Sequence, residues 1–337
     1  MKLANIHRKK FRIWFIFFFL LFVAAILCGI SMGASSVSIT RIIPTFLGQG
    51  TFKEEFVLFS VRLPRVIILA LGGLALAAAG TIFQSVTRND LADPGVIGVN
   101  AGAGVGVTVF YLFASTNLQQ YVFMLPIAAF FGALLTVGCI YLFSFEKGQG
   151  IQPFKLVLVG VGFATALSGL MVLLMSTAER ADVQFISKWL VGNIWGIDWP
   201  YLWALLPWFI LCLPILFYKV NVLNVLSMKE STAIGLGVNL NKERVLLLFL
   251  AVALAGSAVA VTGAISFIGL MAPHIAKKLI GPKHQYFLPV ALLIGATLLV
   301  IADTIGRILL SSATIPAGLV VAFIGAPYFI FLLIRNK

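Results

Sequence analysis

One acidic residue, Asp303, stands inside a long apolar stretch, and Arg307 follows it four residues later. Residues four apart lie on the same face of a helix, so the two charges can pair. An ionisable residue at membrane depth commonly belongs to a substrate pathway or a proton relay, which makes Asp303 a candidate relay acid. The alternative is a structural pair in which Asp303 and Arg307 neutralise each other.

Two further arginines, Arg62 and Arg65, flank the dipeptide Leu63-Pro64. Proline is well suited to the first turn of a helix, so a helix is expected to begin here. The two guanidinium groups can simply snorkel to a membrane surface. Arginine on the outer side of a membrane opposes the usual excess of positive charge on the inner side. In that position, Arg62 and Arg65 are candidates for docking an acidic partner.

Residues for catalysis, metal binding or phosphate binding are poorly represented. His274 and His284 are ten residues apart and have no neighbouring carboxylate or thiol, which does not favour a metal site. The four-residue spacing of Gly98, Gly102 and Gly106 favours close helix packing over a phosphate cradle, because no strand precedes it. We find no nucleophile with a nearby base. We therefore predict a protein that is not an enzyme and needs no cofactor or metal.

The elements that carry these residues must be membrane helices. Of the 337 residues, 61% are apolar and 10% are charged, and the mean hydropathy is +1.08, whereas soluble domains have about 25% charged residues. Such a chain uses lipid as its solvent, which excludes a secreted disulfide scaffold and most soluble enzymes. About 20 apolar residues span a bilayer, and eight charge-free windows meet that length. One window is long enough for two helices, and a second is split near 263–269.

The sequence thus predicts an all-α polytopic membrane protein with ten transmembrane helices and both termini in the cytoplasm. It forms one transmembrane domain over residues 1–337, with a basic tail at 1–12, a ten-helix bundle at 13–334 and a cytoplasmic loop at 219–244. The expected helices are 13–32, 65–86, 96–114, 121–144, 154–176, 201–218, 245–264, 268–280, 287–310 and 317–334.

The positions of the charges support this topology. Of the 24 Lys and Arg residues, 17 fall on the cytoplasmic side and 7 on the outer side or in the outer half of a helix. Cytoplasmic loops of membrane proteins carry an excess of Lys and Arg. The net charge of +13 is therefore a sign of membrane orientation, and no nucleic-acid partner is expected.

Two loops have compositions that suggest specific roles. The outer segment 181–200 contains Trp189, Asn193 and Trp195, and it is either an aromatic belt at the interface or an interfacial helix at a pathway entrance. The cytoplasmic loop 219–244 contains a short helical pattern over 228–238. It is either a plain linker or a small helix pair that fits a groove on a cytosolic partner.

Several short segments together resemble the permease subunits of binding-protein-dependent ABC importers for iron siderophores, haem and vitamin B12, the FecCD-type permeases. These segments are Arg62 to Arg65, Asn89 to Gly98, Gly102 to Gly104, Trp189 to Gly192, Ala233 to Gly237, Gly263 to Leu270, Ala272 to His274, Ala302 to Arg307, Pro316 to Gly318, Gly325 to Pro327 and Phe329 to Leu332. The resemblance covers nearly the whole chain and implies the BtuC-like ten-helix fold.

The resemblance also implies partners and residue roles. The partners are ABC ATPase subunits, an extracytoplasmic solute-binding protein and a second permease protomer, identical or similar, in a bacterial plasma membrane. Arg62, Arg65 and Arg307 match the family's binding-protein docking positions. The ATPase coupling positions correspond to Lys229, Glu230, Ala233, Gly235, Leu236 and Gly237.

The resemblance implies an iron(III)-siderophore as substrate, with haem or cobalamin as alternatives. An ion-coupled secondary transporter, with Asp303 as its relay acid, is the rival function.

Overall fold

The computed structural model describes residues 2–33, 38–95, 97–114, 123–146, 150–192, 198–309 and 314–335. These residues are almost entirely helical. Their one strand pair is an antiparallel hairpin of β1 (Phe145–Glu146) and β2 (Gly150–Ile151). The long helices are α1 (Lys2–Ser31), α4 (Leu63–Thr87), α5 (Val99–Phe113), α6 (Met124–Ser144), α7 (Pro153–Ser176), α9 (Trp199–Tyr218), α12 (Leu240–Thr262), α13 (Ile268–Ile280), α14 (His284–Ile308) and α15 (Ala317–Arg335).

Each of the ten expected segments coincides with one of these helices. Within the described residues, eight helices are long and apolar enough to cross a membrane. The remaining two, α5 with 15 residues and α13 with 13, are shorter. Ten crossings with cytoplasmic termini therefore stay a prediction.

Shorter helices occupy the segments between these spans. The first connection contains α2 (Ile39–Phe46), α3 (Phe52–Glu55) and the π-helical η1 (Phe56–Arg62), which continues directly into α4. The sequence did not predict these three. The segment between α7 and α9 contains α8 (Arg180–Leu190), and the loop after α9 contains α10 (Val220–Leu226) and α11 (Glu230–Gly235). The loop is thus a pair of small helices, one of the two forms expected for it.

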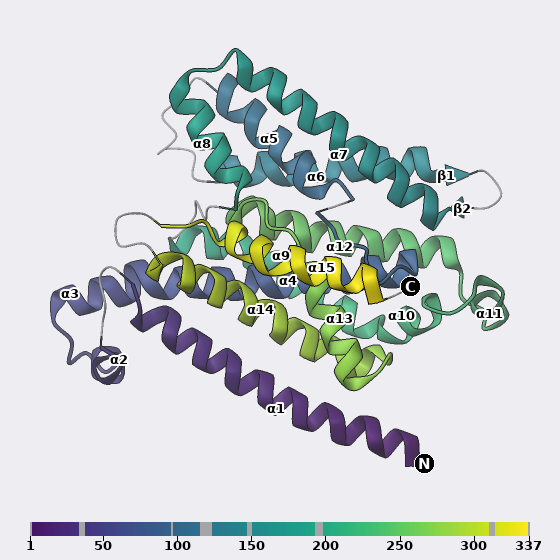
Figure 1. Ribbon diagram of the computed structural model, residues 1–337, viewed down its shortest axis with the longest axis horizontal. Helices are drawn as coiled ribbons and strands as arrows, with labels where there is room; N and C mark the ends of the chain where they lie inside the picture. The colour runs from purple at the N-terminus through teal and green to yellow at the C-terminus, as the bar shows by residue number, and fades with distance from the viewer. Residues whose placement is uncertain are drawn as a thin grey trace.

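Helices α4, α12 and α14 form the core of the molecule, and α13 packs beside them. Small residues bring the backbones of these helices together, as expected for packing in lipid. At Gly73 and Gly80, an added Cβ would collide with the carbonyl oxygens of Gly295 and Gly269. Figure 1 shows α1 on one flank of this core and α5, α6, α7 and α8 on the other.

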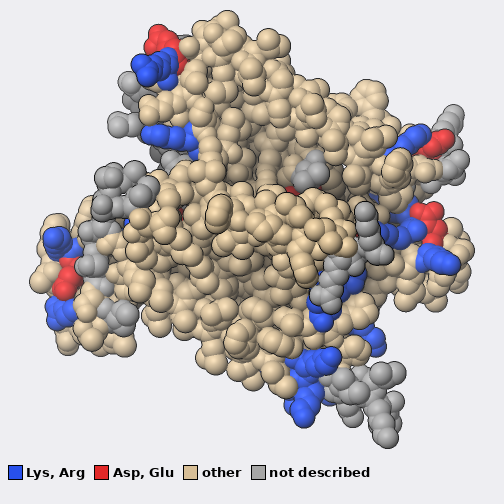
Figure 2. Space-filling model, in the orientation of Figure 1, with Lys and Arg blue, Asp and Glu red and all other residues tan. Residues whose placement is uncertain are grey.

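The molecule has two polar ends separated by an apolar middle. The N-terminus, the β1–β2 hairpin and α11 lie at one end, whereas α2, α3 and α8 lie at the other (Figure 1). On the face in Figure 2, charged side chains gather toward these two ends and are sparse between them. This arrangement is the one expected for a bundle whose middle faces hydrocarbon.

The predicted break near 263–269 separates α12 from α13. Helix α12 ends at Thr262, and α13 begins at Ile268 after Phe267, which has a φ of +70°. Asn100 on α5 donates to the carbonyl oxygen of Ile265 at 3.2 Å. Irregular backbone at membrane depth requires such protein partners, because lipid offers no hydrogen bonds.

Candidate docking and coupling sites

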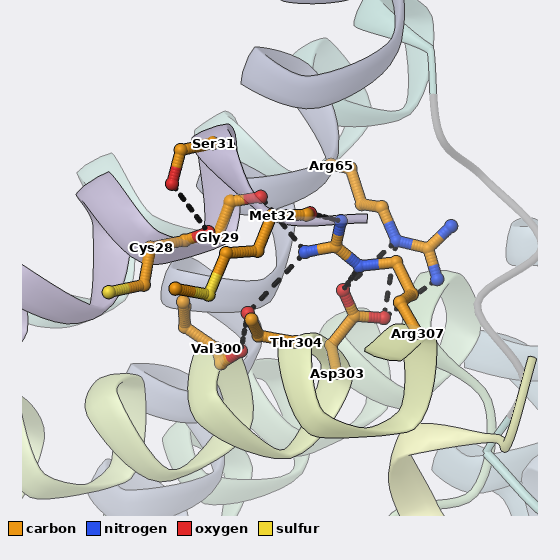
Figure 3. Close-up of polar contacts among 9 residues, drawn as sticks. All are labelled: Cys28, Gly29, Ser31, Met32, Arg65, Val300, Asp303, Thr304 and Arg307. Atoms are coloured by element: carbon orange, nitrogen blue, oxygen red, sulfur yellow. Dashed lines mark hydrogen bonds and ion pairs between the residues drawn. The ribbon is translucent and has the colours of Figure 1, made fainter. Parts of the chain in front are cut away.

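Asp303 lies at the centre of an ion-pair cluster between α4 and α14 (Figure 3). Arg65, near the start of α4, donates from Nη2 to Asp303 Oδ1 at 2.7 Å and from Nε to both carboxylate oxygens at 3.1 and 3.2 Å. Arg307, one turn after Asp303 on α14, donates from Nε to Oδ2 at 2.8 Å. Bidentate arginine–carboxylate pairs of this kind are strong and directional. One buried carboxylate therefore binds two guanidinium groups from two helices.

Arg307 also binds the end of a third helix. Its Nη1 donates to the carbonyl oxygen of Met32 at 2.8 Å, and its Nη2 donates to that of Gly29 at 2.9 Å. The last carbonyl groups of a helix have no partner within the helix and need one from outside. Arg307 supplies these partners at the end of α1, so the Asp303 cluster connects α1, α4 and α14.

Arg62 lies beside this cluster, close enough to Arg65 and Asp303 for electrostatic interaction. Its side chain is buried and packs against Gly33. The three arginines and Asp303 together carry a net charge of +2. The structure therefore brings together all of the expected docking arginines at the α2–α3 end of the molecule, although they face inward. The side chains of Arg65 and Arg307 are 15% and 7% exposed, because Asp303 attracts both.

The candidate coupling residues lie on and around α11 at the opposite end. Ala233 is buried, whereas Lys229 and Leu236 are exposed. No described atom lies within 4 Å of a Cβ placed on Gly235 or Gly237, and Gly237 adopts a φ of +77° as the chain leaves the helix. Most residues of α11 are therefore exposed, and Ala233 is its buried residue.

Glu230, the first residue of α11, accepts hydrogen bonds from two arginines. Arg88 donates from Nη2 at 2.7 Å, and Arg244 donates a short hydrogen bond to the same oxygen, Oε1. The hydrogen bond from Arg244 is the main cause that lowers the pKa of Glu230 below its ordinary value. The sequence did not identify Arg88 or Arg244 as partners, because they lie 142 and 14 residues away.

The expected pathway entrance is described only in part. Trp189, on α8, is 1% exposed and packs in the hydrophobic core, so its ring does not line an open surface. A large apolar ring gains most by burial, and the role of Trp189 at a pathway entrance stays a prediction. Asn193 and Trp195 lie outside the described residues.

Comparison with known proteins assigns the family. Residues 20–335 match the family model described as the FecCD transport family. The chain belongs to the FecCD transport family. It is 40% identical over 321 residues to the iron(3+)-hydroxamate import system permease protein FhuG of Bacillus subtilis, covering 94% of this chain and 95% of that protein. It is 38% identical over 289 residues to the Fe(3+) dicitrate transport system permease protein FecD of Escherichia coli, covering 86% and 88%.

A solved structure shows the same architecture. A metal-chelate type ABC transporter in an inward-facing conformation matches with a TM-score of 0.83 and 32% identity, covering 95% of this chain and 98% of that one. This member of the FecCD family is therefore a multi-pass protein of the bacterial plasma membrane. It is a transport component, and it is not itself an enzyme.

Proposed function

We propose that this chain is the permease subunit of an ABC importer for an iron(III)-siderophore complex. The substrate class is supported by the sequence identity to permeases of iron(3+)-hydroxamate and Fe(3+) dicitrate import. Haem and cobalamin, the other substrates implied by the sequence, have no such support among these relatives. Deletion of the gene should abolish uptake of radiolabelled iron from a siderophore and leave haem-dependent growth intact. Loss of haem or cobalamin use alone would overturn the assignment.

The proposed assembly contains this chain, a second permease protomer, ATPase subunits and an extracytoplasmic solute-binding protein. In it, the ten helices cross the membrane and the loop at 219–244 lies in the cytoplasm with both termini. The chain has no GxxxxGK[ST] sequence for binding nucleotide phosphates, so in this assembly the ATPase subunits would bind and hydrolyse the ATP. Reconstitution into vesicles tests this. Uptake should require the ATPase, and uptake driven by an ion gradient alone would instead support a secondary transporter.

The proposed docking site for the solute-binding protein is the cluster of Arg62, Arg65 and Arg307. This proposal is supported by the net positive charge of the three arginines around Asp303, at the end of the molecule opposite α11. Acidic groups of the binding protein would share these guanidinium groups with Asp303.

Arg65→Glu should weaken binding of the loaded solute-binding protein. Arg41→Glu is the matched control, because Arg41 lies at the same end, on α2, and pairs with Glu54 at 2.9 Å. Equal affinity of wild type, Arg65→Glu and Arg41→Glu would contradict the docking role.

The proposed coupling element is α11 with its flanking residues Lys229, Leu236 and Gly237. Its support is that two large apolar side chains, Ile234 and Leu236, are exposed at the polar end of the bundle. Replacing Glu230 to Gly237 by a Gly-Ser linker should abolish transport-coupled ATP hydrolysis. Coupling that survives this replacement would refute the assignment. The pathway entrance at Trp189, Asn193 and Trp195 remains a prediction from sequence.

A further inference from the structure

The carboxylate of Glu230 is the point at which α11 meets two of the three core helices. Arg88, directly after α4, and Arg244, in the first turns of α12, both donate to its Oε1 atom. Ala233 is the buried residue of α11. Among the described contacts, this short helix is therefore held by one buried apolar residue and by one carboxylate that binds two arginines.

The two arginines differ in their environments. Arg244 is 2% exposed, whereas Glu230 is 46% exposed. A buried guanidinium is costly to desolvate, which favours keeping the carboxylate in place. The pair of Glu230 with Arg88 is more exposed and contributes little to folding stability, as is usual for surface ion pairs.

Arg88 joins α4 to both small helices of the loop. It follows the last residue of α4 in a left-handed conformation, with a φ of +51°. Its Nε donates to the carbonyl oxygen of Leu226, the last residue of α10, at 3.2 Å, while its Nη2 binds Glu230 on α11. The end of α10 and the start of α11 are thereby bound to one side chain.

The opposite end of α4 carries Arg65, which binds Asp303 in the docking cluster. Arg65 and Arg88 are 23 positions apart, which corresponds to about 35 Å along a helix axis. A single buried helix therefore connects the two clusters. A buried helix transmits displacement as a rigid element, because close-packed interiors are not continuously deformable.

We propose that Glu230 is the positioning residue that transmits movement between α11 and helices α4 and α12, through Arg88 and Arg244. The inference rests on the proposed coupling role of α11. When the ATPase displaces α11, Glu230 moves Arg88 and Arg244 with it. The same residues transmit the effect of binding-protein docking from the Arg65 end of α4 to α11 and the ATPase, since coupling between two sites is reciprocal.

The experiment uses the complete transporter in vesicles, with its ATPase and solute-binding protein. Glu230→Gln removes the charge while keeping the shape of the side chain. Two quantities are measured: the stimulation of ATP hydrolysis by loaded binding protein, and the ligand transported per ATP hydrolysed. Glu230→Gln should lower the stimulation several-fold, because the carboxylate that links α11 to Arg88 and Arg244 has lost its charge. The ATPase should still co-purify with the permease.

Glu146→Gln is the matched control. Glu146 is an acid of similar exposure, 41%, paired with Lys155 at 2.9 Å, and it lies on the β1–β2 hairpin at the same end of the molecule. It should behave as wild type. Arg88→Gln should also lower the stimulation, and the double variant with Glu230→Gln should lose less than the sum of the two single losses, because the contact between Glu230 and Arg88 is shared.

Three results would overturn the inference. The first is wild-type stimulation in Glu230→Gln. The second is loss of ATPase binding in Glu230→Gln, because Glu230 would then contact the ATPase directly. The third is a double variant whose loss equals the sum of the two single losses. Ile234→Asp separates these from failure of the proposed function. If Ile234→Asp releases the ATPase while Glu230→Gln is normal, only the inference fails. If neither variant changes binding or stimulation, the coupling role of α11 fails as well.

Discussion

Removing the charge of Asp303 should destabilise the permease far more than removing an exposed acid. In Asp303→Asn, the side chain keeps its size, but the guanidinium groups of Arg65 and Arg307 lose their shared carboxylate. Asp303 is 3% exposed, and the two arginines are also largely buried. Breaking a buried pair while leaving its partner charged costs about 3–5 kcal/mol. The new amide hydrogens of Asn would also point toward donors, which adds repulsion.

The measurement is the thermal unfolding midpoint of the detergent-purified permease. A loss of this size should lower the midpoint by roughly 5–10 °C. Glu54→Gln is the control, because Glu54 forms a more exposed pair with Arg41 at the same end of the molecule, and such pairs contribute about 0–1 kcal/mol. Equal midpoints for Asp303→Asn and Glu54→Gln would refute the view that the buried carboxylate stabilises the junction of α1, α4 and α14.

Further predictions concern helix packing and pH. Gly80→Ala should lower stability by about 1–3 kcal/mol, because the new methyl group collides with the backbone of Gly269. Gly138→Ala on α6 has open space around it and should be neutral or stabilising by up to about 1 kcal/mol. Thermal unfolding of both variants checks this, and equal losses would contradict the packing argument. The pKa of Glu230 is lowered from 4.5, so its stabilising contact with Arg244 is fully present above that pH. The contact is lost as the pH falls through the lowered pKa. Hydrogen exchange of α11 amides, corrected for intrinsic rates, should show unchanged protection from neutral pH down to about 4.5 and less protection below it. Loss of protection nearer to neutral pH would contradict the contact.

The positions of the long helices were predictable because hydropathy is a local property. Each of the ten expected segments coincides with a long helix, and the break after Thr262 falls within 263–269, where the sequence predicts that an apolar window is split. The helices α2, α3 and η1 were missed because they lie in a loop without a long apolar run. Their ends depend on local contacts such as the capping box of Thr51 and Glu54.

The types of the candidate site residues were predictable from the sequence, but their surroundings in the structure were not. Arg62, Arg65 and Arg307 were recognised as a set, and the structure brings them together. The sequence predicted contact with Asp303 for Arg307 alone, and it did not predict that all three arginines are largely buried beside this acid. Only the contact between Asp303 and Arg307 could be predicted from helical spacing, because these two residues are four positions apart along the chain. Arg65 lies 238 residues from Asp303.

The sequence by itself determined the solvent, the long helices, the distribution of charge between the two ends and the family resemblance. Each of these follows from composition or from residues close together along the chain. Only the tertiary structure decided which faces of the helices meet, and hence that Asp303 binds Arg65 and that Glu230 binds Arg88 and Arg244. The physical reason lies in the membrane. In water, an apolar stripe marks the buried face of a helix, whereas in lipid both the buried and the exposed faces are apolar. The rotation of each helix is then set by close packing of small residues and by a few long-range ion pairs.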